Sequence, residues 1–191
     1  ALGRERSLTY KTLVLTGLRL GELASIRVGD VHLDEKTPYL ELSAEHEKNR
    51  KGSSIPVRQD LAEDLKAWLN EKLARLQTDA KKQAQPIPVK LPAAALLFTV
   101  PKALHKILDR DLTMAGISKR DDRNRTVDVH ALRTTFGTLL SRGGVSLRVA
   151  QAAMRHSDPR LTANVYTDER LLDLGGAISK LPALPLTSAS P

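Results

Sequence analysis

The chain has no cysteine among its 191 residues, so disulfide bonds, thiolate catalysis and zinc sites with cysteine ligands are excluded. A sequence without cysteine suits a reducing compartment, and we expect an intracellular, cytoplasmic protein. Its apolar runs fall short of the roughly 18 residues that a membrane span needs, and residues 1–10 have no apolar signal-peptide core. The sequence therefore predicts a soluble protein without a membrane partner.

Aromatic residues are also scarce, at 3% of the sequence. This scarcity argues against a surface that stacks the bases of single-stranded DNA or RNA. The chain instead carries 30 Lys and Arg against 22 Asp and Glu, a formal net charge of +8. Because cationic contacts to phosphates release bound counterions, this balance makes duplex nucleic acid the leading partner. A basic domain that binds no nucleic acid stays open on charge alone.

Signatures of cofactor sites are missing as well. The five histidines do not show the spacing of a zinc-protease motif, and no compact cluster of acidic residues suggests a magnesium site. The chain also lacks the glycine-rich loops that bind ATP or nicotinamide dinucleotides. We therefore expect no metal and no cofactor.

Apolar residues recur at helical spacing over most of the chain, and glycines and caps mark where the helices end. The predicted helices are 7–26 (two helices broken at Thr16 and Gly17), 60–76 (capped by Asp60 with Glu63), 101–115, 128–142 (capped by Asp128) and 146–154 (capped by Ser146). Short β-prone runs at 31–33, 39–43 and 53–57 predict a small antiparallel sheet. The fold class is therefore mainly α with a small antiparallel β-sheet (α+β).

We expect one domain over residues 1–174. Within it, residues 77–92 are rich in Lys, Gln and Pro and lack periodicity, which predicts an exposed loop or insertion. Residues 175–191 form a C-terminal tail, either mobile or docking on a partner, with Gly175 and Gly176 giving it freedom to move.

The stretch DVHALRTTFGTLLSR places His130 and Arg133 three residues apart, on one face of a predicted helix. An arginine presents a planar fork that matches two phosphate oxygens, and a histidine can move a proton near neutral pH. Together they suit phosphoryl transfer. An isolated His-x-x-Arg pair is more often a surface histidine beside a solvated arginine, because the pattern is so short.

Three other stretches strengthen the case. TGLRLGEL puts Arg19 just after a turn, near a helix N-terminus that favours anions. EHEKNRKGSSIPV places Lys48 at the edge of the predicted hairpin, and MRHSDPRLTANVYTD contains His156 with Tyr166 ten residues later. Each signal is weak alone, but their order along the chain is specific.

In this order the residues resemble the catalytic domain of the tyrosine recombinases, the phage integrase and Xer-like family of DNA breaking and joining enzymes. The resemblance runs from about Leu8 to Glu169. TGLRLGEL is similar to the family's first-arginine motif, HALR to its His-x-x-Arg motif, and HSDPRLTANVYT to its final histidine-to-tyrosine segment. Lys48 falls where the family has its β-hairpin lysine.

The resemblance implies a site-specific recombinase or integrase that works on duplex DNA, as a homo-tetramer on paired sites, without metal or ATP. Tyr166 would form a 3′-phosphotyrosyl intermediate, Lys48 would protonate the leaving oxygen, and His130 would assist proton transfer. Arg19, Arg133 and His156 would stabilise the charged phosphate. The implied catalytic set is thus Arg19, Lys48, His130, Arg133, His156 and Tyr166.

Further residues have supporting roles in this interpretation. Glu22, one turn after Arg19, could orient an arginine or histidine. Arg50, Lys51 and Arg155 are expected to contact DNA; for Arg155, an extra cation within the site and a residue that faces the DNA backbone or solvent both stay open. Arg155 is also a departure, because family members usually have a small residue, commonly glycine, immediately before the last histidine.

Family members usually carry a DNA-binding domain upstream of the catalytic domain, and we expect none in the residues before Leu8. We therefore expect this chain alone to be monomeric or weakly associated, to bind DNA weakly and to recombine poorly. Two alternatives stay open on the sequence. One is a relaxase similar to the type IB topoisomerases, and the other is a basic helical domain that binds DNA without cutting it.

Overall fold

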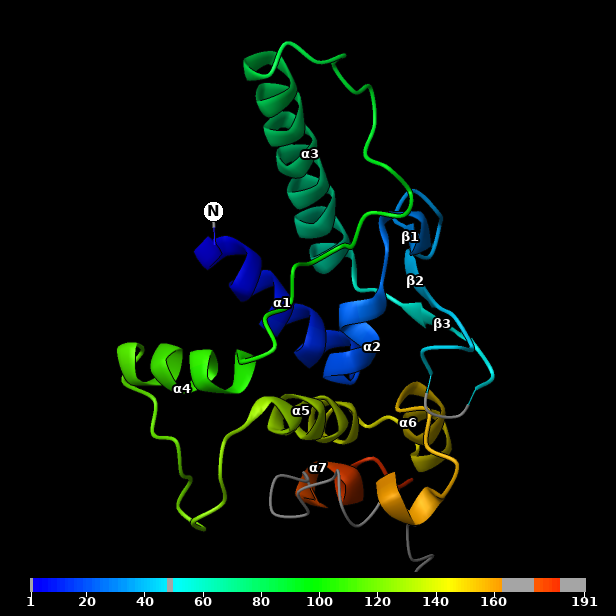
Figure 1. Ribbon diagram of the computed structural model, residues 1–191. Helices are drawn as coiled ribbons and strands as arrows, with labels where there is room; N and C mark the ends of the chain where they lie inside the picture. Colours follow the sequence, from blue (N-terminus) through cyan, green and yellow to red (C-terminus); the bar gives the residue numbers. More distant parts are fainter. Residues whose placement is uncertain (1, 48–49, 163–173, 183–191) are drawn as a thin grey trace, which may run out of the picture.

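The computed structural model describes residues 2–47, 50–162 and 174–182. Helices dominate these residues, as predicted, and Figure 1 shows one small sheet at the side of the helices. The helices are α1 (Leu2–Thr16), α2 (Leu20–Ser25), α3 (Gln59–Lys82), α4 (Leu104–Met114), α5 (Val129–Arg142), α6 (Leu147–Ala153) and α7 (Leu174–Ser179), with a short 3₁₀ helix at Val28–Asp30. The strands are β1 (Val31–His32), β2 (Tyr39–Leu42) and β3 (Ser53–Pro56).

The sheet is antiparallel with the order β1-β2-β3, which confirms the predicted fold class. Leu40 on the central strand pairs with Val31 on one side and Ile55 on the other. Leu40 and Leu42 are buried whereas Glu41 between them is exposed. This alternation places one face of β2 against the helices and leaves the other in solvent.

The core lies between α1, the start of α3 and the sheet. Its largest fully buried members include Leu13, Leu61, Leu65, Trp68 and Phe98. The Trp68 indole N–H is satisfied there, because it donates to the Leu97 carbonyl at 3.0 Å. Helix α1 also packs against α5, so this core supports the helix that carries the His-x-x-Arg pair.

Two local features set the direction of the chain near that pair. Asp128 caps α5 as predicted, since its carboxylate accepts a hydrogen bond from the Ala131 N–H at 2.8 Å. Between α1 and α2, Gly17 adopts a left-handed conformation with φ of +60°. A Cβ on Gly17 would lie 2.7 Å from Phe136 Cε1, so only glycine lets this turn approach α5 so closely. Arg19 follows this turn.

The structure corrects two predicted boundaries. Helix α3 continues to Lys82, so residues 77–82 are helical and only 83–92 lie outside helices and strands. The helix continues because residues 77–82 include good helix formers, and Lys81 and Lys82 suit the negative end of the helix dipole.

Asp60 is not the N-cap of α3, because the helix begins one residue earlier with Arg58 at the cap. Asp60 instead forms ion pairs with Arg58 at 2.9 Å and with Lys11 of α1 at 3.0 Å. Helix α1 begins at Leu2, before the apolar pattern starts, and Gly175 and Gly176 lie within α7. The division into a domain over 1–174 and a tail over 175–191 stays a prediction.

Candidate active site

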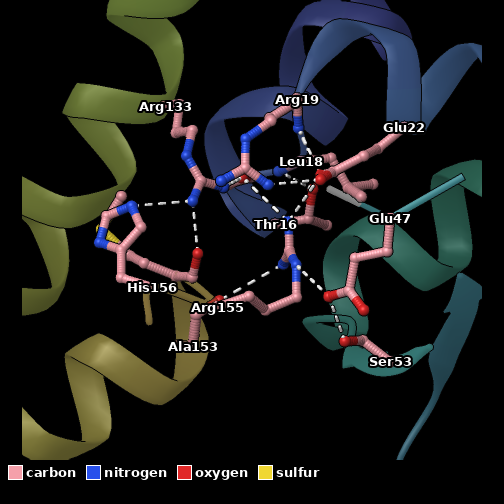
Figure 2. A network of polar contacts seen from close by, with 12 residues as sticks. Thr16, Leu18, Arg19, Glu22, Glu47, Ser53, Arg133, Ala153, Arg155 and His156 are labelled. Carbon is pink, nitrogen blue, oxygen red and sulfur yellow. Dashed lines mark hydrogen bonds and ion pairs between the residues drawn. The ribbon is translucent and has the colours of Figure 1, made fainter. Parts of the chain in front are cut away.

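Three of the predicted catalytic residues meet in one network although they are far apart in the sequence (Figure 2). Arg19 lies at the N-terminal end of α2, Arg133 on α5, and His156 just after α6. The packing of α1 on α5 and of α5 on α6 brings these elements together. The site therefore depends on tertiary structure that no single motif contains.

Arg133 is held mainly by main-chain carbonyls. Its side chain is buried, and its two terminal nitrogens donate to the carbonyls of Gly17 and Met154. One of them, Nη2, also lies 3.0 Å from His156 Nε2. Because a guanidinium loses much rotational freedom when several of its N–H groups are bound, Arg133 is fixed before any substrate arrives.

These contacts define the tautomer of His156. A guanidinium can only donate, so His156 Nε2 accepts from Arg133 and carries no proton. The proton is therefore on Nδ1, which donates to the Thr162 hydroxyl at 2.8 Å. Burial, followed by the charges of Arg133, Arg19 and Arg155, lowers the pKa of His156 to about 4. His156 is thus neutral at pH 7, with its ring fixed by bonds on both nitrogens.

Arg19 and Glu22 are bound to each other at the start of α2. The Arg19 Nη1 atom lies 2.5 Å from Glu22 Oε1, and the Arg19 main-chain N–H donates to Glu22 Oε2 at 2.8 Å. Burial acts to raise the pKa of Glu22. The hydrogen bond from the Arg19 N–H and the charges of Arg155 and Arg19 outweigh that effect, so the pKa of Glu22 is lowered. Glu22 is therefore an anion that orients Arg19.

Arg155 occupies an unusual position at the end of α6. Its φ is +53°, the left-handed region that favours glycine. Its N–H binds the Ala152 carbonyl and the next N–H binds the Gln151 carbonyl, the pattern of a Schellman motif. A residue other than glycine in this conformation costs about 1–3 kcal/mol. The surroundings of Arg155 must compensate for that strain.

The Arg155 side chain is only 8% exposed, which does not fit a residue that faces solvent and is consistent with the alternative of an extra cation within the site. Its Nη2 atom lies 2.9 Å from Glu22 Oε2 and donates to the Gly17 carbonyl at 3.3 Å. Its Nε atom lies 3.8 Å from Glu47 Oε1. The guanidinium is turned inward because two buried carboxylates are available to pair with it.

His130 lies on the exposed side of α5, at the edge of a cavity of about 490 Å³. Asp121, Arg125 and Asp128 also line this cavity. Burial and the charge of Arg133 lower the pKa of His130, partly offset by Asp128. His130 is therefore a second imidazole that is largely neutral at pH 7, placed where a proton could pass to or from solvent.

The remaining predicted residues are placed only in part. Lys48 and Tyr166 lie outside the described residues, so their predicted roles stay predictions. Arg50 and Lys51 are exposed in the connection between β2 and β3. That exposure leaves both cations accessible to a polyanion.

Sequence reasoning missed three residues of this network. Thr162 fixes the His156 tautomer, and Glu47 accepts a hydrogen bond from the Ser53 hydroxyl at 2.6 Å while pairing with Arg155. Thr162 stands within the histidine-to-tyrosine segment and Glu47 directly precedes Lys48. Position beside a motif was the only signal for them, because a threonine or glutamate in a loop is ordinarily solvated.

The described residues contain no group of three His, Asp or Glu side chains arranged to hold a metal ion. Over the same part of the chain, no helix combines the length and the apolar composition needed to cross a membrane. The site instead gathers two arginines and a neutral histidine, with Arg155 beside them. Such a set is suited to an anion with several oxygens, such as a phosphodiester.

Comparison with known proteins agrees with the family resemblance of the sequence motifs. Residues 3–171 match the model of the phage integrase family. The tyrosine recombinase XerD of Lacticaseibacillus casei is 29% identical over 86% of this chain and 50% of its own length. XerC of Halalkalibacterium halodurans is 28% identical over 90% of this chain and 53% of its own. The chain thus spans about half the length of these curated relatives.

Solved structures show the same fold. The XerH recombinase bound to a palindromic difH substrate in a post-cleavage complex superposes with a TM-score of 0.64 at 26% identity, over 93% of this chain and 46% of that one. The XerA recombinase superposes with a TM-score of 0.68 at 20% identity, over 94% of this chain and 60% of that one. Family match, relatives and fold agree with the resemblance in the motifs around Arg19, Arg133 and His156, and the chain belongs to the phage integrase family.

Proposed function

We propose that this chain is the catalytic part of a site-specific DNA recombinase or integrase, which cuts and rejoins duplex DNA through a 3′-phosphotyrosyl intermediate. The observation that carries the proposal is the network of Arg19, Arg133 and His156, three groups suited to a phosphate and drawn from separate elements. Relatives of the same family that act on DNA support it, including XerH in its complex with difH.

In the first step, the Tyr166 hydroxyl oxygen attacks the phosphorus of the DNA backbone. The P–O5′ bond breaks, and the 3′ end of the cut strand becomes joined to Tyr166. Lys48 gives a proton to the departing 5′ oxygen, while His130 assists removal of the tyrosine proton. In the second step, a 5′ hydroxyl attacks the phosphotyrosine and releases Tyr166, so the energy of the phosphodiester is retained.

Arg19 and Arg133 stabilise the charge that builds on the non-bridging oxygens. Because main-chain carbonyls and Glu22 already hold their guanidiniums, little reorganisation is needed when the phosphate binds. Groups placed in this way typically contribute about 10²–10³-fold each to the rate. A bound phosphodiester would also raise the pKa of His156, which would let its Nε2 atom donate to the phosphate.

No metal or nucleotide is needed in this mechanism. Two arginines and a lysine supply the positive charge that Mg²⁺ brings to other phosphoryl-transfer enzymes. The phosphotyrosine conserves the bond energy, so ATP has no role. We therefore assign the chemistry entirely to side chains of this protein.

The partner in this proposal is duplex DNA, and the working assembly is a homo-tetramer on paired sites inside the cell. Arg50 and Lys51 would contact the DNA backbone. The exposed side chains of Ile178 and Leu181, at 66% and 68%, would let residues 175–191 dock on a neighbouring subunit. The catalytic domain itself would end near residue 174.

The test is the capture of a covalent adduct. The chain is incubated with nicked suicide duplexes that carry random sequence beside the nick, and adducts are separated on a denaturing gel and sequenced. We expect an adduct that the Tyr166→Phe variant does not form. If wild type and Tyr166→Phe both bind DNA and neither forms an adduct, the chain binds DNA without cutting it.

A second assay separates a recombinase from a relaxase. Once the target sequence is known from the captured adducts, two such sites are placed in one plasmid. A recombinase exchanges strands between the two sites, whereas a relaxase removes supercoils from any plasmid. Relaxation of a plasmid without the target sequence, and no exchange between paired sites, would favour the relaxase.

A further inference from the structure

The strained position of Arg155 and its two buried partners stand out beyond the proposed mechanism. Glu22 belongs to α2 and binds Arg19, whereas Glu47 belongs to the connection between β2 and β3. Arg155 lies between them and contacts both carboxylates (Figure 2). The side chains of Glu22 and Glu47 are 3% and 2% exposed, so neither carboxylate is hydrated as it would be at the surface.

The charges of these buried groups make the contact important for stability. Burying a carboxylate without a cation costs free energy, and removing one partner of a buried ion pair destabilises a protein more than replacing the whole pair by apolar residues. Arg19 pairs with Glu22. Among the described residues, Arg155 is the cation that pairs with Glu47, and the Ser53 hydroxyl donates a hydrogen bond to the same carboxylate. Arg155 therefore fixes Glu47 relative to α2.

Glu47 is the residue directly before Lys48 in the sequence. Adjacent Cα atoms are about 3.8 Å apart, so the contacts that hold Glu47 hold the residue from which the lysine-bearing segment starts. Farther along the connection, Arg50 and Lys51 are exposed, and the Arg50 N–H donates to the Glu47 carbonyl at 3.0 Å. The contact between Arg155 and Glu47 thus connects the start of this connection to the network of Arg19, Arg133 and His156.

We infer that Arg155 is a positioning residue that couples the lysine-bearing connection between β2 and β3 to the arginine network, through Glu47 on one side and Glu22 on the other. This inference rests on the proposed function, in which Lys48 is the general acid. It also accounts for an arginine in a left-handed conformation, because a glycine would relieve the strain but remove the Arg155–Glu47 ion pair.

The test separates the leaving-group step from the rest of the reaction. A suicide duplex selected by wild type is made in two forms, one ordinary and one with sulfur in place of the 5′ bridging oxygen. A thiolate, whose conjugate acid has a pKa near the roughly 8.5 of cysteine, leaves without a general acid. Lys48→Ala should therefore be rescued by sulfur, whereas Arg133→Ala should not.

The informative variants are Arg155→Gly and Glu47→Gln, measured in single turnover at saturating protein. We expect each to slow adduct formation on the ordinary duplex by at least about tenfold, since a well-placed general acid contributes about 10²–10⁴-fold. On the sulfur duplex each should return to within about threefold of wild type, as Lys48→Ala does. Arg155→Gly relieves the left-handed strain, and circular dichroism would show that both variants fold.

Lys82→Ala serves as a charge-matched control at the far end of α3, and it should leave both rates unchanged. Equal slowing of Arg155→Gly on both duplexes would overturn the inference and place Arg155 at the phosphate. Unchanged rates with a higher protein concentration at half-saturation would overturn it as well, and would make Arg155 a DNA contact. Failure of wild type to form any adduct with a duplex that it binds would instead refute the proposed function.

Discussion

Gly17 offers the most direct test of how the site is assembled, through the substitution Gly17→Ala. The residue has φ of +60°, and an added Cβ would lie 2.7 Å from Phe136 Cε1. The left-handed conformation costs alanine about 1–2 kcal/mol relative to glycine, and overpacking a fitted contact costs about 1–3 kcal/mol. We therefore expect Gly17→Ala to lower the free energy of unfolding by about 2–5 kcal/mol.

Urea denaturation followed by fluorescence measures this loss, because the single tryptophan, Trp68, is buried in the core. In a Phe136→Ala background the clash is absent, and Gly17→Ala should cost only the backbone contribution of about 1–2 kcal/mol. Gly21→Ala is the matched control. Nothing lies within 4 Å of a Cβ there and the position is helical, so it should be neutral or stabilise by up to about 1 kcal/mol. An equal cost of Gly17→Ala in both backgrounds would refute the packing argument.

Two further predictions concern the helices that carry the site. Burial and neighbouring arginines hold the pKa of His156 at about 4 when folded, against about 6.5 when unfolded, so the unfolded chain binds the proton first and stability falls as pH drops. The loss from pH 7 to pH 5 should be about 2 kcal/mol, and urea titrations of His156→Gln should show a correspondingly flatter dependence. Asp128→Ala should destabilise the chain by about 1 kcal/mol through loss of the α5 cap, whereas Asp128→Asn should cost only about a few tenths of a kcal/mol. Thermal denaturation measures both variants. Equal losses of stability would show that the cap is unimportant.

Much of the fold follows from local signals in the sequence. The caps of α5 and α6 were predictable because Asp128 and Ser146 each precede an apolar run, and their side chains accept from the N–H groups of Ala131 and Val149. The three strands were predictable because β-prone residues alternate between turns. The end of α3 was not, because Lys- and Gln-rich sequence is equally common in exposed helices and in loops.

The candidate site was predictable as a set of residues but not as a network. The motifs identified Arg19, Arg133 and His156, since family spacing links them. The inward direction of the Arg155 side chain could not be predicted. It depends on Glu47, a residue 108 positions away that no sequence pattern pairs with Arg155. Long-range ion pairs of this kind depend on how the chain folds in three dimensions, and local periodicity in the sequence does not reveal them.

One consequence of the Gly17 carbonyl concerns redesign of the site. That single peptide oxygen accepts from both Arg133 and Arg155, so it acts as a reference point from which two cations are spaced. A side-chain substitution cannot delete it, but adding one residue to the turn would displace it by up to about 3.8 Å. The length of this turn therefore helps to set the spacing of the two guanidiniums at the phosphate site. Loop grafting or insertion between α1 and α2 would change that spacing without altering any catalytic side chain.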